Sequence, residues 1–251
     1  MKLNIISFNI RYCDDKDGNS IEERAPRLKK VTLPKDADII CFQEYTPLWE
    51  KHIERIYGEK YAIFNRYRSV SSLEGVPILW KRDKFDLLKS GYFWLSDTPE
   101  IESRGWDELY HCYRICLYVV LREKKSGKEL TVINTHFGFG DKGQSDSSNL
   151  IFEYSQKISS NPTFITGDFN MHPEDLGYCE MVKHFDDANM LTKKDLSTTY
   201  HGYNPEKISN EHIDYCFIDK SIKAVDVSLI DEKVDGAFPS DHYGLFIELD
   251  I

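Results

Sequence analysis

Short apolar runs of strand-like composition recur along the whole chain and constrain its fold more than any other feature. They are rich in β-branched and aromatic residues and are bounded by turn residues. We expect strands over residues 2–10, 38–43, 61–65, 76–81, 85–95, 114–122, 129–136, 162–168, 213–219, 223–230 and 243–249. Helical periodicity is rarer and predicts helices over 20–33, 46–58, 147–160 and 174–184. We expect Ser147 and Ser148 to cap the third helix.

The order of these elements favours one domain over two. Strands occur at both ends of the 251 residues, helices lie between them, and no stretch rich in Pro, Gly or Ser separates two halves. Strands outnumber helices, so we expect two sheets packed on each other with helices outside. This is a layered α/β arrangement, and we assign residues 1–251 to a single domain.

The net charge of the chain limits the classes of partner that it can bind. A formal net charge of −10 argues against binding nucleic acid through a broad basic surface. It does not exclude a nuclease whose cleft is locally cationic and holds a metal ion. No apolar stretch has the length of a membrane span, and the first residues lack the pattern of a signal peptide. We therefore expect a cytoplasmic protein, with a removed leader as the alternative and a monomer as the default.

One strand end combines a carboxylate with an amide. The strand near 162–168 runs into Gly167-Asp168-Phe169-Asn170. Because residues i and i+2 of a strand point the same way, Asp168 and Asn170 would face one spot while Phe169 enters the core. A hard cation that binds a phosphate favours such oxygen ligands. Taken alone, the same four residues are also typical of an Asx turn that ends a strand.

Five other strand ends repeat this pattern of polar residues after or before an apolar run. They are Asn9; Gln43 and Glu44; Asn134 and His136; His212 and Asp214; and Ser240, Asp241 and His242. Each has a structural alternative: a turn for Asn9, a helix cap for Glu44, a core histidine for His136 and a loop pair for Asp241 and His242. Their joint occurrence at strand ends favours a shared site, because α/β folds assemble sites along one edge of a sheet.

The ordered set resembles the endonuclease/exonuclease/phosphatase superfamily. The resemblance is carried by Asn9, Gln43-Glu44, Asn134-Thr135-His136, Gly167-Asp168-Phe169-Asn170, Ile213-Asp214-Tyr215 and Ser240-Asp241-His242. The segment Gly91 to Pro99, with Gly105-Trp106-Asp107 and Arg114, resembles a bacterial branch whose substrates are mostly undefined. The family implies the deoxyribonuclease-I-like fold, a four-layer α/β/β/α sandwich in which two packed mixed β-sheets are flanked by helices.

The resemblance implies a divalent cation, Mg²⁺ or Mn²⁺, held by Glu44, Asn9 and Asp241. Mg²⁺ commonly binds through one or two carboxylates and keeps several waters. The cation would polarise the phosphoryl group and stabilise charge in the transition state. Asp168 would position or deprotonate the attacking water, and the amide of Asn170 would donate to a phosphate oxygen.

The remaining roles fall on two histidines and their neighbours. His242 would be oriented by Asp214 and would bind phosphate as a cation or act as a base when neutral. His136 would contact the phosphate or protonate the leaving oxygen, which is general acid–base help worth about a hundred- to ten-thousand-fold in rate. Arg114 is a further phosphate contact, with a surface ion pair as the alternative.

The segment after His136 departs from the bacterial branch, in which Asp-His and then Arg usually follow. Here Gly138, Phe139 and Asp141-Lys142-Gly143 follow, so the substrate of the branch does not transfer to this chain. Aromatic residues form either the mouth of the cleft or the core: Phe137, Phe139, Trp94, Trp106, Tyr110 and Tyr113.

The sequence thus predicts a metal-dependent phosphoesterase that hydrolyses a phosphodiester or phosphomonoester by direct attack of water. A nuclease acting on DNA or RNA, and a noncatalytic binding protein on the same fold, are the alternatives.

Overall fold

The computed structural model describes residues 1–192 and 196–251, which form two six-stranded mixed sheets. The first has the strand order β11-β12-β1-β2-β4-β3 and the second β5-β6-β7-β8-β10-β9. The first sheet comprises β1 (Lys2–Asn9), β2 (Ile39–Gln43), β3 (Tyr61–Phe64), β4 (Ile78–Lys81), β11 (Lys223–Ile230) and β12 (Gly244–Asp250). The second comprises β5 (Phe85–Trp94), β6 (Ile115–Glu123), β7 (Glu129–His136), β8 (Thr163–Asp168), β9 (Asp186–Asp187) and β10 (Asp214–Ile218).

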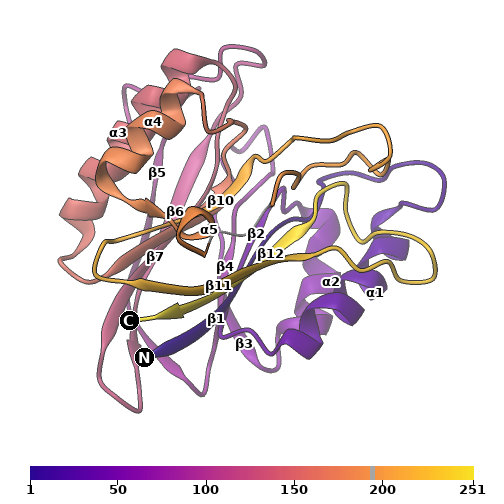
Figure 1. Cartoon of the computed structure of the whole chain (residues 1–251), viewed down its shortest axis with the longest axis horizontal. Helices are drawn as coiled ribbons and strands as arrows, with labels where there is room; N and C mark the ends of the chain where they lie inside the picture. Colours follow the sequence, from indigo (N-terminus) through magenta and orange to yellow (C-terminus); the bar gives the residue numbers. More distant parts are fainter. Residues whose placement is uncertain (193–195) are drawn as a thin grey trace.

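Helices cover the outer face of each sheet, so the fold is the expected four-layer sandwich (Figure 1). Helices α1 (Ile21–Thr32) and α2 (Pro47–Tyr57) pack on the first sheet, with a 3-10 turn, η1 (Leu33–Lys35), after α1. Helices α3 (Asp141–Ile158) and α4 (Leu176–His184) pack on the second, and the short α5 (Ala188–Thr192) follows β9. Among the described residues, no helix combines the length and apolarity that a membrane crossing requires.

Strand residues alternate between two cores because successive side chains point to opposite faces of a sheet. On β1, Ile5 enters the core between the two sheets, whereas Ile6 and Phe8 enter the core under α1 and α2. On β8, Phe164 faces the other sheet and Ile165 faces α3 and α4. Burial on both faces explains why the strands read as nearly continuous apolar runs.

The eleven predicted strands and four predicted helices are present, with one substantial error of position. Helix α3 begins at Asp141, six residues before the predicted start. Ser147 and Ser148 do not cap it; their hydroxyls lie inside the helix and donate to the carbonyls of Gly143 and Gln144, one turn earlier. Serine hydroxyls can bond to the preceding turn in this way, so the serines did not mark a helix start. The sequence also gave no signal for the two-residue β9 or for α5.

Candidate functional site

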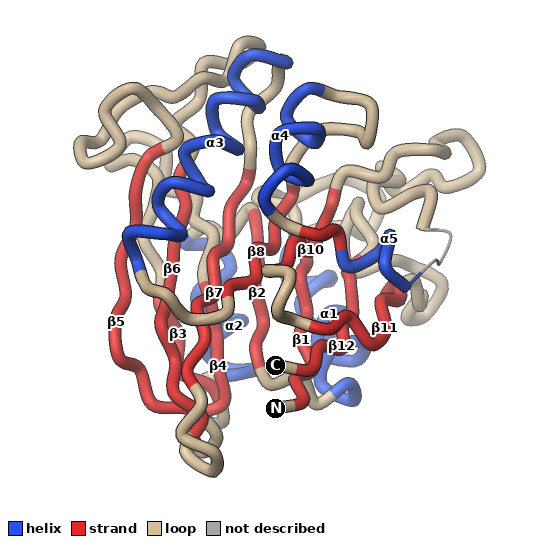
Figure 2. The backbone as a smooth tube through the Cα atoms, turned by 60° about the vertical axis from the view of Figure 1, so that its left-hand side comes forward, coloured by secondary structure: helices blue, strands red, loops and turns tan. Residues whose placement is uncertain are grey.

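The predicted polar residues meet because strands of both sheets end, or begin, at one edge of the sandwich (Figure 2). The parallel strands β1 and β2 end in register at Asn9 and Gln43. The parallel strands β7 and β8 end in register at His136 and Asp168. Strand β10 is antiparallel to β8 and begins with Asp214 opposite Asp168. The carboxyl ends of parallel strands are where α/β folds usually place their sites.

Asp168 lies at the centre of this edge. Its Oδ2 accepts a hydrogen bond from the Asn9 amide at 2.9 Å and lies 3.5 Å from His136 Nε2 and 3.7 Å from His242 Nε2. Its Oδ1 accepts from the backbone N–H of Asn170 at 3.1 Å. One buried carboxylate therefore links side chains from three other segments of the chain.

Asn170 forms the Asx turn predicted for its strand end and also lines the cleft. The bond from its N–H to Asp168 closes an Asx turn, and its backbone has a left-handed φ of 49°, which Asn adopts more readily than most residues. Phe169 is fully buried, with its ring centroid 4.8 Å from that of Phe137, while Asp168 and Asn170 line the cleft. The Asn170 amide donates to the Phe137 carbonyl at 3.0 Å.

His242 is paired with Asp214 in a buried dyad. Nδ1 of the histidine lies 2.9 Å from Oδ2 of the aspartate. Burial lowers the pKa of His242, but the charges of Asp214 and then Asp168 outweigh burial and raise it to about 10. The Tyr200 ring meets the imidazole edge to face, with centroids 5.0 Å apart. The arrangement favours an imidazolium whose Nε2 faces Asp168.

Glu44 follows β2 in a left-handed conformation with a φ of 59°. Such a conformation is uncommon for Glu and is often found at functional sites. The carboxylate accepts from the Asn9 amide at 3.1 Å and from the Tyr12 N–H at 2.8 Å, which are both neutral donors. Burial and then repulsion from Glu74 raise the pKa of Glu44.

His136 has a second partner that the sequence did not reveal. Its Nδ1 lies 3.5 Å from Glu74 Oε1, and the same oxygen is 2.8 Å from Arg68 Nη1. Burial opposes ionisation of Glu74, but His136 and Arg68 outweigh it and lower its pKa to about 2. Both Arg68 and Glu74 come from the connection between β3 and β4, which carries no periodic pattern, so nothing in the sequence connected them with His136.

Four of the strand-end residues have structural contacts and do not line the cleft. Gln43 and Asn134 are fully buried and join the two sheets through a hydrogen bond of 2.8 Å. His212 is buried, and its Nδ1 contacts the Leu196 carbonyl. The Ser240 hydroxyl donates to the Asn9 carbonyl at 2.6 Å and holds the loop before β12 against β1.

Arg114 is buried, so the alternative of a surface ion pair is wrong. Its Nη2 lies 3.3 Å from Asp107 Oδ2, its Nη1 has no hydrogen-bond partner among residues 1–192 and 196–251, and the side chain lines the cleft. Of the aromatic candidates, Phe137 and Trp94 belong to the core, whereas Tyr110 and Phe139 line the cleft.

The cleft has a volume of about 920 Å³, which is in the range of small-molecule sites. The predicted site residues that line it are Glu44, His136, Asp168, Asn170, Asp241 and His242. The lining also includes residues that the sequence did not point to: Arg11, Tyr12, Arg68, Glu74, His172, Tyr200 and Glu211. Arg11 had a detectable signal, because it stands two residues after Asn9. Its Nε lies 3.0 Å from Asp15 Oδ2 and 3.6 Å from Asp241 Oδ2.

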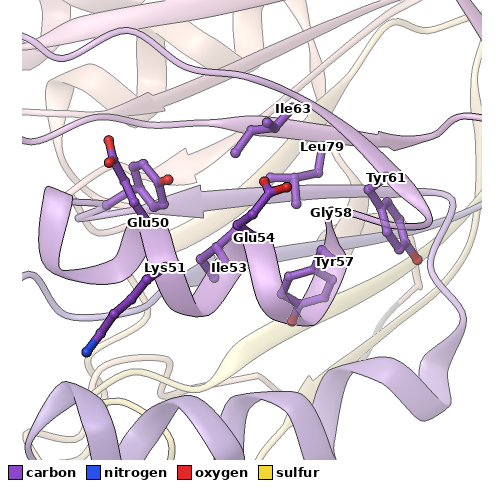
Figure 3. A pocket seen from close by; sticks show the side chains of 10 residues that line it. Glu50, Lys51, Ile53, Glu54, Tyr57, Gly58, Tyr61, Ile63 and Leu79 are labelled. Atoms are coloured by element: carbon purple, nitrogen blue, oxygen red, sulfur yellow. The ribbon is translucent and has the colours of Figure 1, made fainter.

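A second cavity, of about 440 Å³, lies between α2 and the edge strand β3 (Figure 3). Aliphatic and aromatic side chains such as Ile53, Tyr57 and Ile63 line it, with Glu50 and Glu54 from α2. Among residues 1–192 and 196–251, the groups of His and carboxylate side chains close enough to hold a cation lie in the larger cleft or next to it. The larger cleft is therefore the candidate active site.

The donor set of this cleft fits a hard divalent cation. Ligand atoms of Glu44, His136 and Asp168 lie within 4.8 Å of one another, as do those of Asp168, Asp214 and His242. Glu44 is held by neutral donors, which do not compensate a buried negative charge. A cation beside Glu44 would supply that compensation, and oxygen ligands suit Mg²⁺. Asp241 lies outside both groups and faces Arg11.

Comparisons with known proteins agree with this geometry. The profile of the Endonuclease/Exonuclease/phosphatase family matches residues 6–242. A mannosyl-6-phosphatase from Bacteroides thetaiotaomicron has a similar structure, with a TM-score of 0.89 and 26% identity over 99% of this chain and 100% of that chain. An endonuclease/exonuclease/phosphatase family protein from the same bacterium has a TM-score of 0.88 and 26% identity over 100% of this chain and 99% of that chain.

A curated relative is less informative about function. An uncharacterised protein of Acanthamoeba polyphaga mimivirus is 29% identical over 159 residues, and the match covers 59% of this chain and 59% of that protein. The chain therefore spans less than two thirds of the length of that relative.

Proposed function

The chain belongs to the endonuclease/exonuclease/phosphatase family, and from that premise we propose that it is a divalent-metal-dependent phosphoesterase that hydrolyses a phosphate ester by direct attack of water. The observation that carries the proposal is the meeting of Glu44, Asp168 and the His242–Asp214 dyad at one edge of the sandwich. A structural role alone gives no reason for two buried carboxylates and the half-buried Glu44 to gather at a cleft with so few direct cationic partners.

Glu44, with Asn9 and Asp241, would hold the cation, Mg²⁺ or Mn²⁺. When bound, the cation polarises the phosphoryl group and offsets charge that develops in the transition state. The hydrogen bond from the Asn9 amide to Glu44 orients the carboxylate toward the cleft. The bond from Tyr12 N–H to the other Glu44 oxygen fixes the plane of the carboxylate.

Asp168 is the proposed acceptor for the proton of the attacking water. Its Oδ2 faces both His136 and His242, so the water it holds would lie between the two imidazoles. His242, protonated through its contact with Asp214, would donate from Nε2 to a non-bridging oxygen of the phosphate. No covalent intermediate is required, because Asp168, which would accept the proton of water, and the phosphorus atom that water would attack are held in one cleft.

His136, Asn170 and Arg114 would complete the phosphate site. Glu74 at 3.5 Å from Nδ1 would hold the His136 ring in the cleft, where it would contact the phosphate or protonate the leaving oxygen. The unpartnered Nη1 of Arg114 is available to an anion. The Asn170 amide would have to turn from the Phe137 carbonyl to reach the phosphate.

A nuclease acting on DNA or RNA is a less favoured form of the same activity. The net charge of −10 disfavours a long nucleic acid held by phosphate contacts. A small phosphate ester is favoured, and the mannosyl-6-phosphatase of similar structure makes sugar monophosphates one candidate.

The proposal is tested by a substrate panel with Mg²⁺, with Mn²⁺ and with chelator. The panel contains bis-p-nitrophenyl phosphate, mannose 6-phosphate, inositol phosphates, sphingomyelin, single-stranded RNA and supercoiled plasmid. We expect hydrolysis of at least one small ester, its loss with chelator, and its loss in Asp168→Asn. Hydrolysis that is indifferent to chelator and to this substitution would refute the proposal.

A further inference from the structure

Two aromatic rings form part of the cleft wall near its mouth. Tyr110 and Phe139 lie edge to face with centroids 5.5 Å apart, and both line the cleft. Tyr110 is 63% exposed. A large ring left in water beside a deep polar site is more informative than an isolated surface residue, because aromatic pairs normally gain stability by burial.

A single carboxylate holds both rings in place. Asp107 is 1% exposed, and its Oδ1 accepts from the backbone N–H groups of Tyr110 at 3.0 Å and Phe139 at 3.4 Å. Its Oδ2 lies 3.3 Å from Arg114 Nη2. Asp107 therefore fixes the ring pair relative to the guanidinium deeper in the cleft.

The segment after His136 lies flush against the loop that carries Tyr110. A Cβ on Gly138 would come within 2.6 Å of the Asp107 Cβ, so a side chain at this position would push the two segments apart. The carbonyl of Phe139 accepts from the Glu108 N–H at 2.8 Å. Close packing of this kind fixes the backbones that carry the two rings, so less order has to be gained when a ligand binds.

The polar and apolar parts of the cleft are separated. The side chains of Arg114, His136 and His242 are buried, whereas those of Tyr12, Leu73 and Tyr110 are exposed. A substrate that places its phosphate among these buried nitrogen-bearing side chains would extend its alcohol part past Tyr110 and Phe139.

We propose that Tyr110 and Phe139 form a subsite for a planar ring on the alcohol part of the phosphate ester. The inference rests on the proposed phosphoesterase function and names its substrate class. Planar rings stack on an exposed aromatic face. A saturated polyol needs matched hydrogen-bond partners, which the carbon faces of the Tyr110 and Phe139 rings do not supply. A nucleobase and a simple aryl group share this chemistry.

The test compares two esters that differ only in planarity. Benzyl phosphate and cyclohexylmethyl phosphate release primary alcohols of similar acidity, so the chemical step is matched. We expect kcat/KM to be about tenfold higher for benzyl phosphate. Tyr110→Ala should abolish this preference and Tyr110→Phe should restore it. Leu109→Ala is the matched control, because Leu109 is an exposed neighbour that does not line the cleft.

A second pair identifies the source of the ring. Adenosine 5′-phosphate preferred over ribose 5-phosphate supports a nucleobase, whereas a preference confined to benzyl phosphate supports an aryl group. Equal kcat/KM for the benzyl and cyclohexylmethyl esters, or a preference that survives Tyr110→Ala, overturns the subsite and leaves the phosphoesterase function standing.

If none of these monoesters is hydrolysed, the wider substrate panel decides the proposed function, and the subsite is decided by binding. Calorimetry would compare benzylphosphonate with cyclohexylmethylphosphonate on the protein in Mg²⁺. Tighter binding of the benzyl compound that is lost in Tyr110→Ala supports the subsite, and equal binding refutes it.

Discussion

Replacing Asn134 by leucine should weaken the joint between the two sheets directly below the cleft. The Asn134 amide donates to the carbonyls of Phe42 at 2.8 Å, Val76 at 3.1 Å and Pro77 at 3.1 Å, and its oxygen accepts from Gln43 at 2.8 Å. Leucine has nearly the same shape, so the cost comes from lost hydrogen bonds and not from a cavity.

The expected cost follows from counting the groups left without a partner. A net hydrogen bond contributes about 1 kcal/mol, and a buried group left unsatisfied costs about 1–3 kcal/mol. In the variant, the Pro77 carbonyl still accepts from the Phe42 N–H, and the Gln43 amide still donates to the Ser7 hydroxyl. The lost hydrogen bonds to the Phe42 and Val76 carbonyls therefore account for most of the cost. We expect Asn134→Leu to lower the free energy of unfolding by about 4 kcal/mol. At about 2–4 °C per kcal/mol, Tm should fall by roughly 8–16 °C.

Urea unfolding followed by fluorescence and circular dichroism measures this change. Thr166→Val is the matched control, because Thr166 is fully buried on the neighbouring strand in register with Asn134 and its hydroxyl makes no hydrogen bond to a nitrogen or oxygen atom of the described residues. We expect the control to change stability by less than about 1 kcal/mol. Equal small effects of the two substitutions would refute the role of Asn134 as a joint between the sheets.

Three further predictions concern the cleft and its surroundings. Glu74→Gln should reduce kcat/KM about a hundredfold with little change in circular dichroism, because His136 loses its anionic partner; unchanged initial rates would show that Glu74 does not support His136. Burial and then the charge of His242 lower the pKa of His201 from 6.5 to about 4, so the unfolded chain binds a proton before the folded one does as pH falls. The free energy of unfolding should therefore drop by about 3 kcal/mol between pH 6.5 and 4, and His201→Phe should remove that part of the pH dependence in denaturation curves. Mg²⁺ at about a hundred times its Kd should stabilise the protein by about 3 kcal/mol in thermal unfolding, and Glu44→Gln should abolish the effect, whereas Glu54→Gln in the second cavity should not.

The strand ends were predictable because the physics that places them is local. An apolar run of five to eight residues must be buried, and the first polar residue beyond it lies at the edge of the sheet. Asn9, His136 and Asp168 follow this rule, and parallel pairing of their strands brings them together. The rule does not distinguish a residue that lines the cleft from one that joins the two sheets. Gln43 and Asn134, which join the sheets, therefore occupy the same kind of position in the sequence as Glu44 and His136, which line the cleft.

The partners of these residues were not predictable because they depend on the path of loops. Glu74 and Arg68 reach His136 from a connection without periodicity, and Tyr110 meets Phe139 only because Asp107 binds both backbones. The start of α3 was missed for a related reason. Its first turn contains Gly143, a poor helix former, and packing against the loop at Trp106 outweighs that propensity.

In the proposed mechanism, Glu44 holds the cation and Asp168 accepts the proton of the attacking water. The rate of ester hydrolysis as a function of Mg²⁺ concentration tests both roles in one measurement. We predict that Glu44→Gln shifts the Mg²⁺ requirement to higher concentration and that Asp168→Asn lowers the maximal rate by about a hundredfold or more. A rate that does not depend on Mg²⁺, or a Glu44→Gln curve that coincides with that of the wild type, would contradict the account.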